Sequence, residues 1–234
     1  MKINKMAGSF RADVLTGALL CVLLIGPATR AQSTPLLQNG DFETGDLSGW
    51  TVFVTSNGDL GSGWGLPDVV SFDVAGTGTP SDAAEFQAGE ASYNSGTGHT
   101  SQGGGIYQTF NCSAGQYIIS ADVAALNIDY YANADAGLFT LLVDETPTAS
   151  IELGGINTGQ TLRGTLETTV PLSQGSHQIT IEITRPWLTG GGYGATPLEY
   201  LDNIQVEPVP EPSEILLGLF GLSSILILRK SRIR

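Results

Sequence analysis

The chain has 234 residues, with 23 acidic and 10 basic side chains and a formal net charge of −13. Hydrophobic residues make up 41% of it and charged residues 14%, which supports a folded core and excludes wholesale disorder. The 31 glycines follow no Gly-X-Y period, so collagen is excluded and many turns are expected, as in all-β proteins.

The basic residues lie almost entirely at the two ends of the chain. Between residues 32 and 208 the only cations are Arg163 and Arg185, against 20 acidic residues, so this span carries a net charge of −18. So few cations cannot form a basic patch, which disfavours binding to nucleic acid. The ends and the middle are therefore expected to do different things.

Residues 1–31 have the pattern of a secretory signal peptide. A basic stretch precedes a short apolar run over 14–25, and small residues stand at Thr29 and Ala31, which predicts cleavage after Ala31. The alternative is an uncleaved N-terminal anchor, for which the apolar run is short.

Residues 32–207 contain short alternating runs separated by Gly, Asn, Asp and Ser, which is the signature of strands and turns. The predicted strands are 50–55, 69–74, 83–87, 106–110, 116–126, 139–143, 148–153, 161–170, 177–184 and 200–206. In the first of these, Trp50, Val52 and Val54 are placed on one apolar face. This pattern predicts an all-β domain, an antiparallel β-sandwich of the jelly-roll type.

The last part of the chain, 208–234, ends in an apolar run over 215–228 followed by a basic tail. As a helix this run would rise about 21 Å, less than the ~30 Å of a hydrocarbon core, but a short span can insert by thinning the bilayer. The basic tail would then stay cytoplasmic. The alternative is a helix buried in the core, which the charged tail disfavours.

Pro210, Glu211 and Pro212 stand just before this apolar run. Together with the run and the basic tail, they resemble the PEP-CTERM sorting signal. The resemblance implies recognition by an exosortase in the inner membrane, after transient anchoring there. It further implies export to the cell surface or extracellular matrix of a bacterium that makes exopolysaccharide, as in a biofilm.

A second resemblance covers most of residues 36–206. The stretch 37–43 with Gly49 and Trp50, and the stretch 200–206, are similar to the first and last strands of carbohydrate-binding modules with a galactose-binding-like jelly roll. In that family the Glu of the opening Asn-Gly-x-Phe-Glu stretch and the Asp of the final strand help to hold a structural calcium ion. The resemblance implies Glu43 and Asp202 as two of its ligands here.

Asp202 is also a candidate metal ligand because of its position in the predicted strand. By alternation it lies with Tyr200, Ile204 and Val206 on an apolar face, where a carboxylate is costly unless it is paired or coordinated. A hard cation such as Ca²⁺ accepts carboxylate and carbonyl oxygens, and suits an extracellular protein. The alternative is a carboxylate hydrogen-bonded to backbone amides near the end of a strand.

Sugar binding needs exposed aromatic rings, because the apolar face of a pyranose stacks on them. Trp64, Tyr93, Trp187 and Tyr193 lie in Gly-rich or loop-like stretches and are the candidates for carbohydrate binding. The alternative for each is a packing residue that covers the end of the sandwich.

Catalysis has little support, since the sequence contains no G-x-S-x-G, H-E-x-x-H or P-loop motif. His99 is expected to be solvated in a loop, and His177 to be a structural histidine. We therefore expect an exported, non-catalytic protein that binds exopolysaccharide or is embedded in it. The alternatives are a structural or adhesive matrix protein without a sugar site, and a carbohydrate-active enzyme.

Overall fold

The computed structural model describes residues 35–93, 95–189 and 196–210. The predicted signal peptide with its cleavage after Ala31, the apolar run 215–228, and Tyr193, Glu211 and Pro212 lie outside these residues. Within the described part of the chain, no helix has the length and apolar character needed to cross a membrane.

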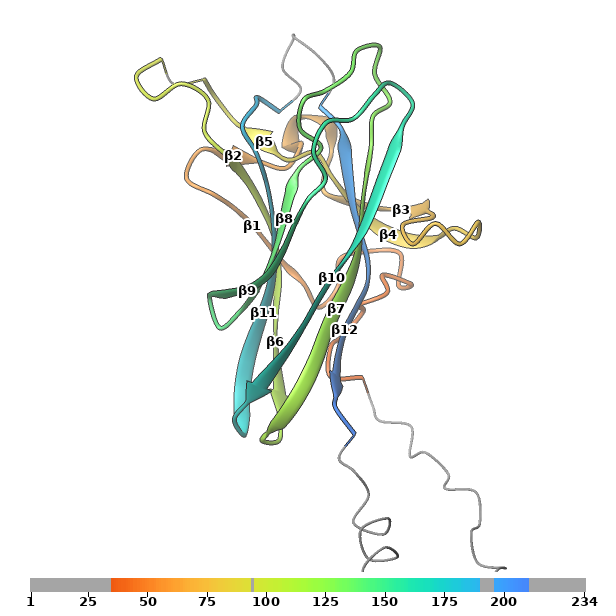
Figure 1. Ribbon diagram of the computed structural model, residues 1–234, viewed down its shortest axis with the longest axis vertical. Helices are drawn as coiled ribbons and strands as arrows, with labels where there is room; N and C mark the ends of the chain where they lie inside the picture. The colour runs from red at the N-terminus through yellow and green to blue at the C-terminus, as the bar shows by residue number, and fades with distance from the viewer. Residues whose placement is uncertain (1–34, 94, 190–195, 211–234) are drawn as a thin grey trace, which may run out of the picture. The chain divides into compact units, whose positions relative to one another are not determined.

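The described residues form two five-stranded sheets that pack face to face (Figure 1). Sheet I has the order β1 (Thr51–Val54), β6 (Gln102–Cys112), β11 (Gly175–Arg185), β8 (Leu138–Val143), β9 (Thr146–Glu152). Sheet II has the order β10 (Thr161–Leu172), β7 (Gly115–Leu126), β12 (Leu198–Pro208), β4 (Ser81–Phe86), β3 (Asp68–Phe72). All neighbouring strands of both sheets are antiparallel, which confirms the predicted antiparallel β-sandwich of the jelly-roll type.

Two smaller elements complete the description. β2 (Gly58–Asp59) pairs with β5 (Gly89–Glu90) as a separate two-stranded ladder. The only helical segment of the described residues is a 3₁₀ turn, η1 (Ser62–Trp64). Both short strands lie outside the ten that alternation predicts, because two residues are too few to show a period.

The main core lies between the two sheets and is built by alternation. On β7, Tyr117, Ile119, Ala121 and Val123 are all buried, as predicted. On β11 the three isoleucines of the predicted apolar face, Ile179, Ile181 and Ile183, are fully buried. Fully burying one such side chain contributes about 1.5–3 kcal/mol, so these two strands supply much of the driving force for folding.

The first strand corrects part of the prediction. Trp50 is buried at 8% exposure; it precedes β1, packs against Phe42 and donates from Nε1 to the Asn39 carbonyl at 2.9 Å. Val52 and Val54, by contrast, are 39% and 54% exposed. β1 is an edge strand of sheet I. Its side chains still alternate between the two faces, but the opposite sheet does not cover them.

The structure of β12 also differs from the prediction, which placed Asp202 on one face with Tyr200, Ile204 and Val206. The register of β12 shifts between Asp202 and Gln205, and Asn203 takes a positive φ of 51°. Tyr200 therefore belongs to a small cluster on the outer face of sheet II, where its ring stacks on Phe72 at 3.9 Å, while Ile204 and Val206 belong to the main core. Asp202 does not share a face with Ile204 and Val206, because a β-bulge reverses the alternation between them.

The segment before β1 fills a gap in sheet II. β12 pairs with β4 only as far as Leu201. Beyond it, the Ile204 amide donates to the Gly40 carbonyl at 2.8 Å. A Cβ at Gly40 would collide with the Ile204 carbonyl, so the close approach of the two chains requires glycine there. This contact places the segment containing Glu43 beside the bulge at Asp202.

Candidate functional site

Three rings gather beyond the ends of β6 and β11. The His99 ring lies 4.8 Å from the Tyr93 ring and 4.8 Å from the Trp187 ring, tilted by 51° and 53°. Tyr93 is 54% exposed and Trp187 is 41% exposed. We call Tyr93, His99 and Trp187 the ring cluster. Two of the four aromatic residues predicted to bind carbohydrate are thus brought together around a histidine.

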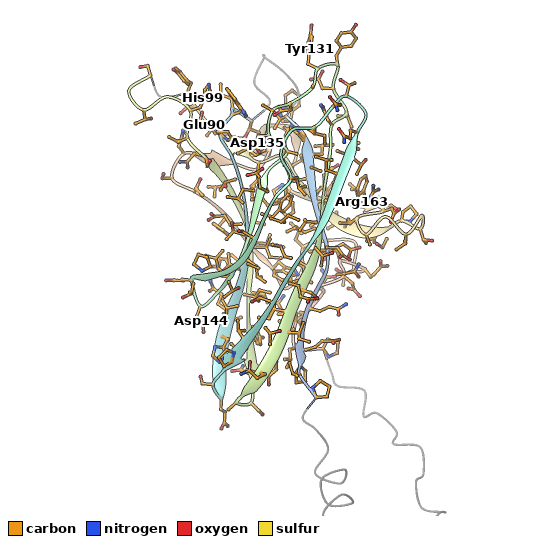
Figure 2. The ribbon with its side chains drawn as sticks, viewed as in Figure 1. Glu90, His99, Tyr131, Asp135, Asp144 and Arg163 are labelled. Atoms are coloured by element: carbon orange, nitrogen blue, oxygen red, sulfur yellow. The ribbon has the colours of Figure 1, made fainter. Side chains whose placement is uncertain are left out.

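Glu90 lies just below His99 in Figure 2 and is only 1% exposed. Its Oε2 lies 2.7 Å from His99 Nδ1, and its Oε1 accepts the Thr100 amide at 2.6 Å and the Thr100 hydroxyl at 3.2 Å. Burial opposes ionisation of Glu90, but the hydrogen bonds from Thr100 and His99 outweigh it and hold its pKa below the ordinary value. An ionised carboxylate accepts hydrogen bonds only, so Nδ1 of His99 carries the proton.

Hydrogen bonds between backbone groups join Trp187 to β5, the strand that carries Glu90. The Glu90 amide donates to the Trp187 carbonyl at 2.8 Å, and the Thr189 amide donates to the Glu90 carbonyl at 2.9 Å. A Cβ at Gly89 would clash with the Trp187 carbonyl and with Thr189, so this approach also requires glycine. Trp187 is therefore held to β5 by hydrogen bonds between backbone groups.

A second group lies on the outer face of sheet I. Phe53 on β1 and Glu182 on β11 are both cross-strand partners of Gly105 on β6, which lies between them and carries no side chain. The Phe53 and Tyr107 rings are 6.2 Å apart. Burial raises the pKa of Glu182. We call Phe53, Tyr107 and Glu182 the outer-face group; all three are partly exposed.

Two residues of the ring cluster, His99 and Trp187, lie just outside the strands that carry Tyr107 and Glu182. β6 begins three residues after His99, and Trp187 follows Glu182 by five residues. Five residues of extended chain span at most about 17 Å, so the backbones of Glu182 and Trp187 lie within that distance of each other. Together they offer aromatic rings, a carboxylate and an imidazole, which is the mixture of apolar and polar contacts that a sugar requires.

Of the other two predicted aromatic residues, Tyr193 lies outside the described part of the chain, and Trp64 is not part of this arrangement; neither are Tyr130 and Tyr131, which were not predicted. Trp64, at the end of η1, is 71% exposed, and within the described residues its ring contacts neither Tyr93 nor Trp187. Tyr130 and Tyr131 are 81% and 63% exposed and contact each other edge to face at 5.2 Å, on the loop labelled at Tyr131 in Figure 2.

Five residues of the site were missed in the sequence: Phe53, Glu90, Tyr107, His99 and Glu182. His99 was expected to be solvated in a loop; it is exposed there, but its ring is also held by Glu90 and two aromatic neighbours, which the sequence did not indicate. The signal that was present for the outer-face group is strand parity, since Tyr107 and Glu182 alternate with buried Ile106 and Ile181.

The two predicted calcium ligands are brought near each other. Asp202 is fully buried; its Oδ2 accepts the Ser81 hydroxyl and its Oδ1 accepts the Asn203 amide, both at 2.6 Å. Burial raises the pKa of Asp202, and the negative charges of Asp122 and Glu43 raise it further. Glu43 in turn accepts the Asp82 amide at 3.2 Å.

Neither of the two arginines in the described part of the chain forms an ion pair with these carboxylates. Arg163 donates to the Asp73 carbonyl, and Arg185 donates to Asp135, Ala88 and Asn133. A divalent ion would fit the donor chemistry, although within the described residues no group of three or more His, Cys, Asp and Glu side chains is arranged to hold a metal. Glu43 and Asp202 would therefore need hydroxyl, carbonyl or water oxygens to complete a coordination shell.

His177 is a structural histidine, as predicted. It is buried, with Nδ1 2.7 Å from Asp144 Oδ2 and Nε2 3.0 Å from the Ser173 carbonyl. The hydrogen bonds to Asp144 and Ser173 raise the pKa of His177, and the bond to Asp144 has the larger effect. Asp144 lies at the opposite end of the sandwich from His99 (Figure 2), so this pair is not part of the ring cluster.

No protein-family model and no curated protein matches the chain. Among solved structures, it is similar to TmCBM61 in complex with beta-1,4-galactotriose, at 16% identity over 76% of this chain and 100% of that one, with a TM-score of 0.46. It is also similar to the CBM22-1 xylan-binding domain of Paenibacillus barcinonensis Xyn10C, at 15% identity over 74% of this chain and 93% of that one, with a TM-score of 0.39. We therefore infer the function from the side chains of this chain.

Proposed function

We propose that the β-sandwich is a non-catalytic glycan-binding domain and that the ring cluster is the centre of its binding site. The observation that carries this proposal is the pair of exposed rings, Tyr93 and Trp187, on either side of a histidine oriented by a buried carboxylate. Exposed aromatic rings stack on the apolar face of a pyranose. With Nδ1 of His99 engaged by Glu90, Nε2 is the ring atom left to exchange a hydrogen bond with a sugar hydroxyl.

The outer-face group extends the site along sheet I. Phe53 and Tyr107 add further rings, and Glu182 is an acceptor for hydroxyl donors. The ligand is a neutral polysaccharide, because the span 32–208 carries a net charge of −18 and repels polyanions. A neutral exopolysaccharide fits both the rings and the charge.

The test is a glycan array on the mature protein, followed by titration calorimetry with the best ligand. Replacing Trp187 by Ala is expected to weaken binding by about tenfold or more, since stacking on one ring contributes on the order of 1–3 kcal/mol in the related case of bases. Val52→Ala, which trims an exposed side chain of β1, is the matched control. If no glycan binds saturably, the domain is a structural or adhesive module instead.

A calcium ion at Glu43 and Asp202 forms the second part of the proposal. Burial of Asp202, with no cationic partner among residues 35–93, 95–189 and 196–210 and with the negative charges of Glu43 and Asp122 nearby, supports it. The ion would supply positive charge that neutralises these carboxylates. Glu43 and Asp202 would hold the segment before β1 against β12, and would leave the ring cluster to bind the glycan.

Export and sorting form the third part. A signal peptide cleaved after Ala31 would deliver the domain across the inner membrane, and an exosortase would act at Pro210, Glu211 and Pro212 after transient anchoring. In support, β12 ends at Pro208 and Pro210 is exposed, so the motif follows directly on the last strand. The mature protein would reside at the cell surface or in the exopolysaccharide matrix. Mass spectrometry of its two ends tests both cleavages.

A further inference from the structure

A buried pair of charged residues, Arg185 and Glu199, lies in the core between the two sheets. Both side chains have 0% exposure, and Arg185 Nε lies 3.8 Å from Glu199 Oε1. This separation is too long for a hydrogen bond between the two side chains. The hydrogen bonds of both side chains go instead to loops at the end of the sandwich.

The pair brackets one residue of the chain, Ala88. Arg185 Nη1 donates to the Ala88 carbonyl at 3.1 Å, and the Ala88 amide donates to Glu199 Oε2 at 2.8 Å. Ala88 directly precedes β5, the strand on which Glu90 accepts from His99 and pairs with the backbone of Trp187. The amide and the carbonyl of Ala88, just before β5, are therefore both hydrogen-bonded to this buried pair.

The same guanidinium holds a second loop. Nε donates to the Asp135 carbonyl at 2.8 Å, and Nη2 donates to the Asn133 side-chain oxygen at 3.0 Å. Arg185 thus satisfies acceptors on two segments that are far apart in sequence. The planar fork of an arginine can do this, and an apolar side chain of the same volume cannot.

We propose that Arg185 and Glu199 are positioning residues for glycan binding, which set the ring cluster by bracketing Ala88 from inside the core. This inference rests on the proposed function, because it assigns the binding site to the ring cluster. Neither residue touches the ligand; both act through the backbone of Ala88 and β5.

A purely stabilising role makes a different prediction. Replacing a buried ion pair by apolar residues of similar volume often leaves stability unchanged or raises it. A pair kept only for stability would therefore be replaceable without consequence for the ring cluster. A pair that positions Ala88 would not be, since an apolar pair offers no partner to the Ala88 amide and carbonyl.

The charge of Glu199 is not what holds Ala88. Burial raises the pKa of Glu199 to about 8, although Arg185 opposes the shift. With or without its proton, the carboxyl group retains an oxygen that accepts the Ala88 amide. The bracket is therefore a matter of geometry, and it persists across neutral pH.

The test is the double variant Arg185→Met/Glu199→Leu in the full mature protein. Amide hydrogen exchange measures how firmly the backbone next to Ala88 is held, and it requires no glycan. We expect protection of the Glu90 and Thr189 amides to fall about tenfold or more, while the Ile181 amide in the centre of β11 stays protected. Glycan affinity is expected to fall by a similar factor.

The matched control is His177→Gln/Asp144→Asn, which removes a polar pair at the other end of the sandwich. It should leave protection at Glu90 and glycan affinity unchanged. Unchanged protection in the Arg185/Glu199 variant, or unchanged affinity despite lost protection, overturns the positioning role. If the wild type binds no glycan yet protection is lost in the variant, the proposed function fails while the bracket itself stands.

Arg185→Lys is the second variant, for use if the double variant does not fold. Lysine keeps the positive charge beside Glu199 but cannot reach the Ala88, Asn133 and Asp135 acceptors with one planar fork. It is expected to reduce protection at Glu90 and Thr189 in the same way. Wild-type protection and affinity in this variant also overturn the proposal.

Discussion

The carboxylate of Glu90 lies 2.7 Å from Nδ1 of His99, and it is almost completely buried while the imidazole is 33% exposed. One partner of this pair therefore belongs to the interior and the other to the surface. Such an arrangement holds a surface ring rigidly, because the buried carboxylate has its other oxygen fixed by Thr100. A rigid ring loses little conformational entropy when it binds a ligand.

Removing the charge of Glu90 should loosen the ring cluster. In Glu90→Gln, one acceptor oxygen becomes an amide donor, which faces either the Thr100 amide or His99 Nδ1–H. We expect a loss of about 1–3 kcal/mol in the free energy of unfolding, and a weaker affinity for glycan. Chemical denaturation and calorimetry measure the two effects. Glu167→Gln, an exposed carboxylate on β10, is the control; equal effects of the two substitutions would contradict the role given to Glu90.

The His177–Asp144 pair predicts a dependence of stability on pH. The pKa of His177 is raised in the folded state by Asp144, so the pair's stabilisation is complete below the unfolded pKa of about 6.5 and is lost as pH rises through the folded pKa. Accordingly, His177→Gln should destabilise the protein more at about pH 5.5 than at about pH 9. Urea denaturation at both pH values measures this difference. Asp144→Asn should likewise destabilise the protein more at the lower pH than at the higher one. A loss of stability independent of pH would show that the pair is neutral.

Much of the fold was predictable because most strands are long enough to show a period. The strands at 175–185 and 115–126 bury alternate residues over their length, and their apolar faces were identified correctly. Val52 and Val54 were placed on the same apolar face as Trp50, but they are exposed, because alternation shows parity and not whether a second sheet covers the strand. The bulge after Asp202 was not predictable either, since one residue with a positive φ reverses the parity of everything that follows.

The candidate site was predictable only in part. Tyr93 and Trp187 were found because large aromatic residues in Gly-rich loops stand out. Glu90 and His99 were not, because their meeting depends on a two-residue strand and on the path of the loop between them. A carboxylate between Gly89 and Ala91 has no local pattern that distinguishes it from the other acidic residues of the domain.

The proposed calcium ion predicts a response to chelator that depends on Asp202. At a calcium concentration about 100 times the Kd, the ion would add about 2.7 kcal/mol to the free energy of unfolding. Removal by chelator should then lower the Tm by roughly 5–10 °C for a domain of this size. Asp202→Asn should abolish the chelator effect, and Glu207→Gln on the same strand should retain it. Differential scanning calorimetry with and without chelator decides, and an unchanged Tm of the parent protein would rule out the ion.

The outer-face group predicts a dependence on the length of the glycan. If the ring cluster and sheet I form one surface, short oligosaccharides occupy the ring cluster alone, and longer ones also contact Phe53 and Glu182. Phe53→Ala and Glu182→Gln should then weaken long ligands by about tenfold, equivalent to ~1.4 kcal/mol, and leave short ligands unaffected. Trp187→Ala should weaken both.

Calorimetric titration with a series of oligosaccharides of increasing length distinguishes these cases. Thr165→Ala, on the outer face of sheet II, is the control, since it trims an exposed side chain on the opposite sheet. If Phe53→Ala weakens short and long ligands equally, the centre of the site lies on the face of sheet I. In that case the ring cluster would be its rim, because affinity follows the subsite that every ligand must fill.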